Sequence, residues 1–430
     1  MSAGAEKPRL AVIGSGIAGL SSAWLLKQKY QVTLLESHER VGMGVYTIDY
    51  DADGIRNRID IPLRVFCEGY YPNLMALYRY IGVEVELGDH SGVFLDASGN
   101  EILHYGNIQF AGRHISYPKL RSLFRPKAWQ LILQYKKFAR LAQRALRQSS
   151  DIRQQTLGQF LAQHQVSEDF TETVLLPVLS VTCTCDYQSL LNYPAEIILV
   201  YLSSGIWKFG ITNARKGVDD IVPRLTDGIQ VQTGKRVKTV RCAEQGIEVH
   251  SADGDVQVFD QVVIASQAQQ AASMLQGFER QKQLLNTVAF ERSDMMIHTD
   301  SSFLPQQGTG FSAVSYCLPK QGQQRPQVSV DLTKAIDKYR QQSTIFQTWH
   351  PAFEPDDDKL LARIEFTRPV VTLESREAMQ QLRQSQQNNP TGVWFCGSYL
   401  ADKIPLLDAA VDSSVNIAQA LGVDIPWHSA

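Results

Sequence analysis

Three glycines and one carboxylate near the start of the chain have the types and spacing that suit binding of a dinucleotide. Gly14, Gly16 and Gly19 form a G-x-G-x-x-G pattern, and Glu36 follows about 20 residues further on. The first glycine permits a tight turn, the second lets a pyrophosphate approach the backbone, and the third allows a helix to pack closely on a strand. The carboxylate of Glu36 can then accept a hydrogen bond from a ribose hydroxyl group.

The neighbouring residues predict the elements that would position these groups. Leu10–Ile13 and Gln31–Leu35 are apolar runs typical of buried strands, and apolar residues recur at helical spacing over residues 17–27. The helix N-terminus would hold the phosphates, because its free N–H groups and its dipole favour anions. The predicted binding turn also contains Ser15, Ile17 and Ala18. A glycine turn in an ordinary α/β domain is the alternative, but such a turn would not require the acid.

Composition and charge exclude several other classes of protein. The chain has 430 residues, of which 44% are apolar and 20% charged, so we expect a folded protein of one to three domains. A net charge of −2 gives no general attraction for nucleic acid. The six cysteines lack metal-ligand spacing, so no metal is expected, and their scatter favours a reducing compartment. No apolar run approaches the roughly 20 residues that span a bilayer, and we expect a cytoplasmic protein.

A second motif distinguishes between the possible dinucleotides. Ser37 follows the acid, and Arg40 and Gly42 stand four and six residues beyond it. This E-x-x-x-R-x-G pattern resembles that of the flavin amine oxidase and phytoene desaturase superfamily, in which the arginine and the glycine backbone wrap FAD. The resemblance implies FAD rather than NAD. Met43 stands where many relatives have a second glycine, so this loop would differ slightly.

The C-terminal segment Thr391–Leu421 resembles the closing FAD motif of the same superfamily. It contains an apolar run that ends at Gly397, then a loop, then a helical pattern with small residues on one face. The resemblance implies that Gly397 and Ser398 lie beside the ribityl chain, with a hydroxyl replacing the usual acid. It also places the helix start, at Leu407 and Ala409, against the flavin pyrimidine ring, where a helix N-terminus can stabilise negative charge.

A third segment, Gly228–Ser266, resembles the adenine-binding part of these flavoproteins. Val237 takes the place of a valine whose backbone meets adenine, and Ala265 ends a strand that is typical of the superfamily. No second G-x-G-x-x-G pattern is present, so we expect no NAD(P)H partner. Cys396 lies within a strand rather than in the Ser-Gly-Gly-Cys context of covalently flavinylated relatives, and this indicates noncovalent FAD.

These motifs predict an α/β fold with a Rossmann-like FAD-binding domain of the glutathione-reductase-like, amine oxidase type and an inserted α+β substrate domain. The FAD-binding domain would be discontinuous, over residues 8–110, 206–290 and 365–425. The substrate domain would comprise residues 111–205 and 291–364. The chain would then be an FAD-dependent oxidoreductase.

Several segments resemble narrower groups within the superfamily. Tyr70–Glu86, Met295–Pro305, Lys359–Val371 and Val393–Leu400 resemble a bacterial and fungal group known as predicted NAD/FAD-binding proteins. Residues 175–205 resemble the polyenoic fatty acid isomerase. The resemblance implies a hydrophobic, fatty-acyl or other unsaturated lipid substrate, which is desaturated or isomerised by hydride transfer to flavin N5. The alternatives are an FAD-dependent amine oxidase and a non-catalytic flavin-binding partner protein.

The candidate catalytic residues are Leu63, Arg64 and Tyr70. In relatives, the segment that matches Leu63 and Arg64 lies against the isoalloxazine ring. Arg64 could favour anionic reduced flavin or bind a substrate carboxylate through two hydrogen bonds. The alternative is a surface salt bridge with Asp60 or Glu68, and packing in the core is the alternative for Tyr70.

Residues 119–147 combine positive charge with apolar side chains. Between Glu101 and Asp151 the chain has ten Lys or Arg and no Asp or Glu, and residues 125–148 have a helical period. A basic amphipathic helix with aromatic residues suits an anionic membrane surface, so peripheral membrane contact is one interpretation. The other is a helix that packs on the domain and leaves its basic face in water.

Overall fold

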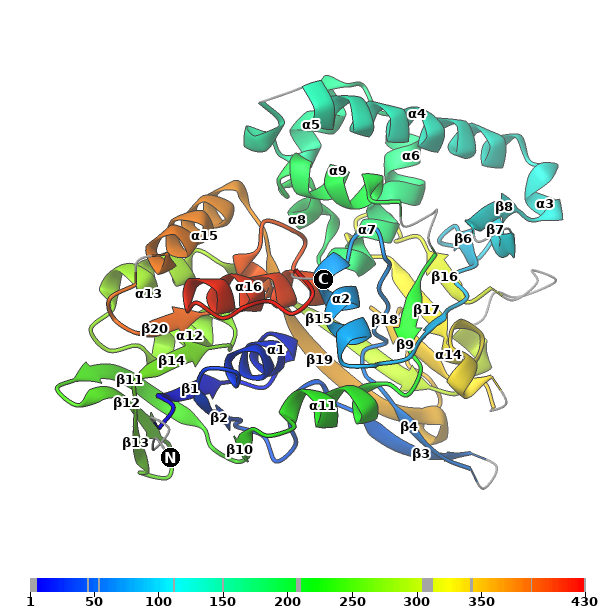
Figure 1. Cartoon of the computed structure of the whole chain (residues 1–430). Coiled ribbons are helices and arrows are strands. Elements are labelled where there is room, and N and C mark those ends of the chain that lie inside the picture. Colours follow the sequence, from blue (N-terminus) through cyan, green and yellow to red (C-terminus); the bar gives the residue numbers. More distant parts are fainter. Residues whose placement is uncertain are drawn as a thin grey trace.

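The computed structural model describes residues 6–44, 46–52, 55–110, 113–148, 151–205, 210–303, 312–340, 343–387 and 389–428. Two large sheets organise this part of the chain, and a group of helices from the middle of the sequence lies at the top of the view in Figure 1. No helix in these ranges is long and apolar enough to cross a membrane.

The first sheet has five strands, all parallel, in the order β10-β2-β1-β14-β20. Its strands are β1 (Arg9–Ile13), β2 (Gln31–Leu35), β10 (Gln230–Gln232), β14 (Gln261–Ile264) and β20 (Val393–Phe395). Crossover helix α1 (Ile17–Leu26) joins β1 to β2, as the sequence predicts. This arrangement confirms the α/β class and the Rossmann-like core.

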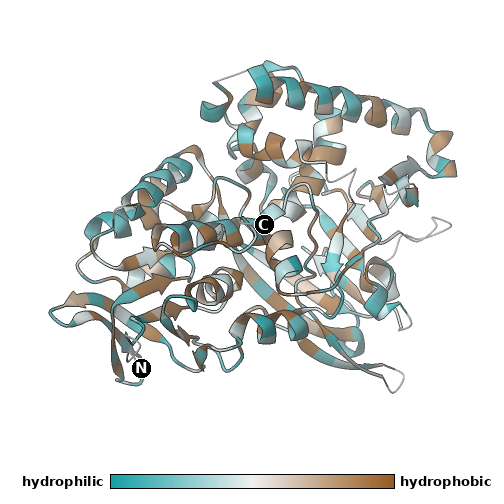
Figure 2. Ribbon diagram, in the orientation of Figure 1, coloured by the Kyte–Doolittle hydropathy of each residue, from teal (hydrophilic) through white to brown (hydrophobic). Residues whose placement is uncertain are grey.

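Both faces of the parallel sheet are covered, because successive side chains of a strand point to opposite faces. Leu10 and Val12 of β1 join a core with α1 and with α16 (Leu407–Ala420), which lie against each other. Ala11 and Ile13 join a second core on the other face. That core contains side chains of α12 (Ala268–Met274), α13 (Glu279–Asn286) and α15 (Leu373–Gln386). Figure 2 shows hydrophilic residues along the outer surface of α15.

The second sheet has eight strands in the order β19-β15-β18-β17-β16-β6-β7-β8, and all neighbours are antiparallel except β16 and β6. Its strands are β6 (Gly92–Leu95), β7 (Glu101–Phe110), β8 (Arg113–Pro118), β15 (Ala289–His298), β16 (Val314–Cys317), β17 (Gln327–Asp331), β18 (Phe346–Trp349) and β19 (Leu360–Val370). The predicted FAD-binding segment 8–110 therefore contributes two strands, β6 and β7, to this sheet. The domain boundaries themselves stay a prediction.

The helices of the middle segment pack together near the large sheet. They are α3 (Leu120–Leu123), α4 (Pro126–Gln148), α5 (Leu157–Gln163), α6 (Glu168–Phe170), α7 (Leu176–Cys183), α8 (Tyr187–Leu191) and α9 (Ala195–Ser203). The long helix α4 buries Ala128, Leu131, Phe138 and Ala142 on one face and contacts α9. This spacing is that of an amphipathic helix, which holds one stripe against the protein and the other in water.

Smaller elements complete the described chain. They are the hairpin β3 (Ile48–Ala52) and β4 (Ile55–Ile59), the pair β5 (Val85–Leu87) and β9 (Thr212–Ala214), the sheet of β11 (Val237–Ala243), β12 (Gly246–Ser251) and β13 (Val256–Phe259), and the helices α2 (Pro72–Tyr80), α11 (Val218–Thr226) and α14 (Leu332–Ala335).

Candidate active site

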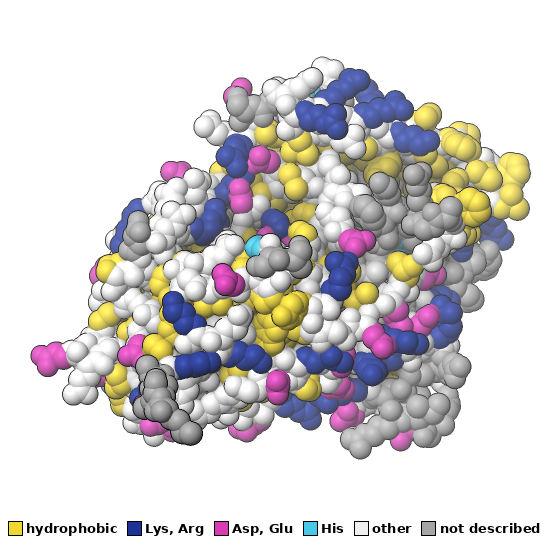
Figure 3. All heavy atoms as spheres, viewed as in Figure 1, with side chains coloured by type: hydrophobic (Ala, Val, Ile, Leu, Met, Phe, Trp, Pro, Cys, Tyr) yellow, Lys and Arg dark blue, Asp and Glu magenta, His cyan; other side chains and the backbone are white. Residues whose placement is uncertain are grey.

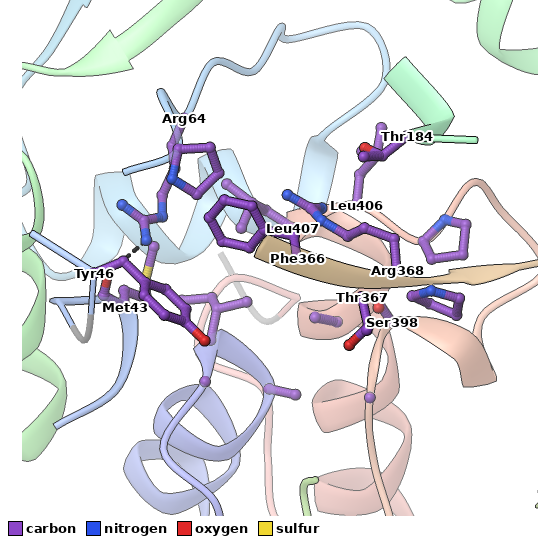
Figure 4. Close-up of a pocket in the computed structure, with 18 of the residues that line it drawn as sticks. Met43, Tyr46, Arg64, Thr184, Phe366, Thr367, Arg368, Ser398, Leu406 and Leu407 are labelled. Carbon is purple, nitrogen blue, oxygen red and sulfur yellow. Dashed lines mark hydrogen bonds between the residues drawn. The ribbon is translucent and has the colours of Figure 1, made fainter. Parts of the chain in front are cut away.

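A cavity of about 830 Å³ lies between the two large sheets. One end is lined at the carboxyl ends of β1, β2, β14 and β20, which is where ligands bind to parallel sheets of this kind. The other end is lined by side chains of the large sheet and of the helices α7 and α9. Figure 4 shows part of its wall. The cavity therefore connects a dinucleotide-type site with a second chamber.

The glycine turn after β1 leaves room for a ligand at the start of α1. Gly16 precedes the helix, has no side chain to cap it, and would meet no atom within 4 Å if it carried a Cβ. A Cβ on Gly19, in contrast, would lie 1.8 Å from the carbonyl oxygen of Gly14. The third glycine thus permits close packing inside the protein, whereas the second faces open space beside the free N–H groups of α1. Both observations fit a bound pyrophosphate.

Glu36 is the buried centre of a hydrogen-bond network at the end of β2. Its carboxylate accepts hydrogen bonds from the backbone N–H and the hydroxyl of Ser15 and from the backbone N–H of His38. Burial raises the pKa of the Glu36 carboxyl, but these bonds together outweigh burial and leave the pKa lowered. Ser15 Oγ also accepts a hydrogen bond of 2.6 Å from the N–H of Gly42. An ionised acceptor is therefore held where a ribose would lie.

Arg64 lies on the cavity wall beside the Gly42 loop, but not in the ion pairs considered from sequence. Its guanidinium donates to the carbonyl oxygen of Met43, which also lines the cavity, as the dashed line in Figure 4 shows. Glu68 instead pairs with Arg79 at 2.9 Å, and Asp60 accepts from the N–H of Val218 at 3.0 Å.

Burial lowers the pKa of the Arg64 guanidinium, and the negative charge of Asp60 partly opposes that change. Arg64 Nη1 is buried and has no hydrogen-bond partner among the described residues. Leu63, the adjacent candidate, lines the cavity and is fixed by a hydrogen bond of 2.7 Å from its N–H to Gln347 Oε1. Arg64 thus lines the cavity and keeps one buried donor nitrogen that no described residue satisfies.

The second helix N-terminus at the cavity belongs to α16. Ser398, Leu407 and Ala410 line the cavity, whereas the predicted Ala409 does not. The residue before the helix, Leu406, offers no side-chain cap, so the first N–H groups of α16 keep no side-chain acceptor. Negative charge on a ligand at this end would be stabilised by the helix dipole.

Most of the remaining predicted cofactor residues also reach this cavity. Those that line it are Gly14, Ser15, Gly16, Ile17, Ala18, Glu36, Ser37, Gly42, Met43, Val237, Ala265 and Gly397. Gly19 is buried behind the turn, and Arg40 is exposed and outside the lining. Cys396 is buried and contacts Ser22 Oγ at 3.4 Å instead of the cavity. Noncovalent attachment stays a prediction.

Tyr70 packs in the core rather than in the cavity wall, which is the alternative considered for it. Its hydroxyl accepts a hydrogen bond of 3.0 Å from the N–H of Ile404, and its ring meets that of Tyr201 edge to face at 4.9 Å. The next residue, Tyr71, lines the cavity instead. Of these two adjacent tyrosines, one packs in the core and the other lines the cavity. Residue spacing in the sequence could not show which of them would do which.

Sequence reasoning missed the residues of the second chamber. Arg368 on β19 is the main one, and it lines the same cavity as Arg64; in Figure 4 the Arg368 side chain lies near Leu406 and Leu407, whereas that of Arg64 turns toward Met43. The aromatic residues missed there are Tyr105, Tyr201, Tyr316, Trp349 and Phe366. One feature of the sequence could have indicated Arg368: it is a positively charged residue within an apolar strand pattern, directly before Pro369 and two valines. The aromatic residues come from four separate strands and a helix, so only the fold gathers them.

Comparison with known proteins agrees with this geometry. A family described as flavin containing amine oxidoreductase matches residues 17–308, which is more than half of the chain. The protein therefore belongs to the flavin containing amine oxidoreductase family. It is an FAD-dependent enzyme, and the two helix N-termini, Glu36 and the glycine turn are the groups here that fit FAD. No curated protein sequence matches the chain.

Solved structures of several enzymes share the fold at low sequence identity. A fatty acid isomerase from P. acnes that produces CLA has a TM-score of 0.68 and 13% identity, covering 96% of this chain and 98% of its own. Putrescine oxidase bound to putrescine has a TM-score of 0.65 and 13% identity, covering 96% and 99%. Cyclohexylamine oxidase from Brevibacterium oxydans IH-35A has a TM-score of 0.60 and 16% identity, covering 97% and 100%. At these identities the likeness shows the fold alone.

Proposed function

We propose that the enzyme desaturates or isomerises a hydrophobic, unsaturated carboxylic acid of the fatty-acid class. The observation that carries this proposal is the pair Arg64 and Arg368 at the second chamber. Neither guanidinium has a carboxylate partner within ion-pair distance in the part of the chain that the structure describes. An arginine binds a carboxylate well because its planar donors match the two oxygens. The pair would therefore hold the acid head group of a substrate.

The walls of the chamber suit the rest of such a molecule. The apolar residues there are Val178, Val181, Leu202, Ile211, Val314, Val328, Val330 and Phe366. All of them except Ile211 come from the helices α7 and α9 or from strands of the large sheet. Burial of an acyl chain against these side chains would contribute about 0.8 kcal/mol for each CH₂ group. A long hydrophobic acid thus gains affinity from both ends.

The residues of this chain would position the substrate rather than perform the electron transfer. Bound FAD supplies a two-electron acceptor for a hydride from a C–H bond; isomerisation returns that hydride to another carbon, whereas desaturation loses a proton and passes two electrons to an external acceptor. Arg64 and Arg368 would anchor the carboxylate, and the apolar wall would exclude water from the reacting carbon. The N-terminus of α16 would favour negative charge on the reduced cofactor.

Amine oxidation is the second candidate, and the family description favours it. Two of the related structures are also named as amine oxidases. Among the described residues that line the second chamber, Asp89 is the carboxylate that could pair with a substrate ammonium group. It is already engaged, because it accepts hydrogen bonds from Ser91 N–H at 2.7 Å and from Asn107 Nδ2 at 3.2 Å. Two nearby guanidinium groups would also repel a cationic amine.

A substrate panel under anaerobic conditions tests the proposal. Purified enzyme with FAD would be mixed with unsaturated fatty acids and, separately, with aliphatic and aromatic amines. We expect fatty acids to bleach the visible flavin band or to return products with a moved or added double bond, detected by mass spectrometry. Bleaching by amines alone would favour the second candidate. No reaction with either class would count against both candidate activities.

A further inference from the structure

One surface of the protein gathers large apolar side chains that point into water. Among the described residues, sixteen large hydrophobic side chains are exposed, and nine of them fall between residues 108 and 133. These nine, here called the apolar patch, are Ile108, Phe110, Ile115, Tyr117, Leu120, Leu123, Phe124, Trp129 and Leu133. Phe124, Leu120 and Phe110 are 80%, 70% and 68% exposed. Single exposed apolar residues are ordinary, but a contiguous group marks an interaction site.

The β7–β8 hairpin places its four members of the patch on one face. Ile108 and Ile115 lie directly opposite each other, and Gly106 lies opposite Tyr117. Opposite residues share a face of a hairpin, as do residues two positions apart in a strand, so Phe110 belongs to the same face. A Cβ at Gly106 would lie 2.8 Å from the ring of Tyr117. The exposed apolar face is therefore a consequence of the strand register.

Helix α3 and the start of α4 extend this surface, since α3 contacts both β7 and α4. Figure 3 shows the resulting cluster of hydrophobic side chains at the right edge of the molecule, below a row of Lys and Arg over α4. The indole N–H of Trp129 donates to the carbonyl oxygen of Leu123 at 2.8 Å, which fixes the ring on the outside of the helix. The patch is thus built from ordered elements.

The exposed stripe of α4 changes from apolar to cationic along its length. Trp129 and Leu133 are followed at intervals of three or four residues by Lys137, Arg140, Arg144 and Arg147, all exposed. Residues at this spacing lie on one side of a helix. The last four are here called the basic stripe. The opposite side of α4 is buried against the protein, as expected for a helix that packs on the domain, and contact with a membrane stays a prediction.

The basic stripe has no acidic partner within the described ranges. No salt bridge joins any of its four cations to a described carboxylate, whereas Lys127 nearby pairs with Asp169. The sequence contains no Asp or Glu between Glu101 and Asp151 that could neutralise them locally. The side chain of Arg113, at the end of the hairpin, lies outside the described residues. The stripe therefore offers four cations, next to the apolar patch, for an anionic partner.

We propose that the apolar patch and the basic stripe form a docking surface for an anionic lipid bilayer. The patch would enter the boundary between head groups and acyl chains, while the cations meet anionic head groups. This surface also lies near the cavity. Tyr105 of β7 lines the cavity and Ile108 belongs to the patch, and three residues of a strand span about 10 Å. A lipid substrate would then have a short path from the bilayer, although docking does not depend on the substrate class.

Vesicle flotation of the FAD-loaded enzyme tests the docking surface. We expect the wild type to float with vesicles of phosphatidylcholine and phosphatidylglycerol, and much less with phosphatidylcholine alone. Phe124→Ser with Leu133→Ser should lower the partition coefficient at least tenfold. Arg140→Gln with Arg144→Gln should lower the partition coefficient about fivefold for each cation removed. High salt should also lower the partition coefficient of the wild type, because it screens the charges.

Matched variants on other surfaces control for general loss of charge or apolar area. Val85→Ser with Val256→Ser removes two exposed apolar side chains elsewhere, and Lys216→Gln with Lys238→Gln removes two exposed cations elsewhere. Both should float like the wild type, and thermal unfolding should show that every variant is folded. The proposal is overturned if the wild type binds neither vesicle, if both vesicles bind equally, or if the patch variants bind unchanged. Self-association abolished by Phe124→Ser, without vesicle binding, would instead assign the patch to a second copy of the chain.

Discussion

Arg64 and Arg368 bring two guanidinium groups to one cavity from segments about 300 residues apart in the sequence. Burial lowers the pKa of the Arg368 guanidinium, and the positive charge of Arg64 lowers it further. Two cations that repel each other in a partly desolvated wall are stabilised when an anion binds between them. Because of this repulsion, the chamber should bind an anionic ligand more favourably than a cationic one.

The first prediction concerns the affinity for a carboxylate. Arg368→Gln should weaken binding of a fatty-acid anion about thirtyfold, because a hydrogen bond to a charged group contributes about 2 kcal/mol. The FAD content should stay that of the wild type. Titration of the flavin spectrum with the acid measures the dissociation constant. Arg363→Gln, at an exposed position on the same strand, serves as control. Equal loss in both variants, or loss of FAD from Arg368→Gln, would argue against the assigned role.

The second prediction separates cofactor binding from folding at the glycine turn. Gly16→Ala should leave the unfolding temperature of the FAD-free protein nearly unchanged, because no atom lies within 4 Å of the added Cβ. The same Cβ would stand where the pyrophosphate approaches, so FAD affinity should fall at least tenfold. Fluorescence titration with FAD and thermal unfolding of the FAD-free form measure the two effects.

Gly19→Ala gives the matched contrast, because its Cβ would lie 1.8 Å from the carbonyl oxygen of Gly14. That variant should lose stability even without FAD, by several kcal/mol of overpacking. If Gly16→Ala retains full FAD affinity, the open space beside Gly16 is not the pyrophosphate site.

The binding turn could be predicted from sequence because its determinants are local. The strand, the glycines, the helix and the acid all lie within residues 9–36, and each has a conformational preference that its neighbours share. The resemblance at the C-terminus then placed Ser398 and Leu407 on the same cavity, although they lie far along the chain. The two ends meet because β20 pairs with β14 and α16 packs on α1.

The second chamber could not be predicted in the same way, since it depends on contacts between distant strands. Trp349 and Tyr316 face one space only because β18, β17 and β16 pair in that order, and strand order does not follow from hydrophobic pattern. The hairpin part of the apolar patch was missed for a related reason. Its hairpin residues have an ordinary strand pattern, and only the register shows that their apolar face stays uncovered.

The third prediction concerns the buried carboxylate at the start of α16. Asp408 is fully buried, accepts a hydrogen bond of 2.8 Å from the N–H of Leu74, and pairs with Lys403 at 2.6 Å. Burial and the charge of Asp412 raise the pKa of Asp408 to about 6. Lys403→Met should therefore destabilise the protein by about 3 kcal/mol at pH 8, because an ionised carboxylate loses its buried partner. Urea unfolding measures the loss.

At pH 5 the loss should be smaller, since a protonated Asp408 needs no cation beside it. A folded-state pKa above the ordinary value means that the folded protein binds the proton more tightly, so this carboxyl favours the folded state more as pH falls through about 6. The double variant Lys403→Met with Asp408→Asn should recover most of the stability at pH 8. If the cost of Lys403→Met is the same at both pH values, the carboxyl does not titrate in this range.

The fourth prediction is a loss of stability in acid caused by a buried neutral histidine. His298 is completely buried on β15, with Nε2 2.8 Å from Thr348 Oγ1, and burial lowers its pKa from 6.5 to about 4. Between these values the unfolded chain binds a proton that the folded chain excludes. The stability from this group is fully present above pH 6.5 and falls toward pH 4 by up to about 1.4 kcal/mol per pH unit.

Urea unfolding at several pH values measures how the free energy of unfolding changes with pH. This dependence should be shallower for His298→Gln than for the wild type, and His164→Gln, at an exposed position, is the control for removal of a histidine. Burial also lowers the pKa values of His104 and His350 to about 4, so some acid sensitivity should persist, and an unchanged slope in His298→Gln would show that this imidazole becomes protonated without unfolding.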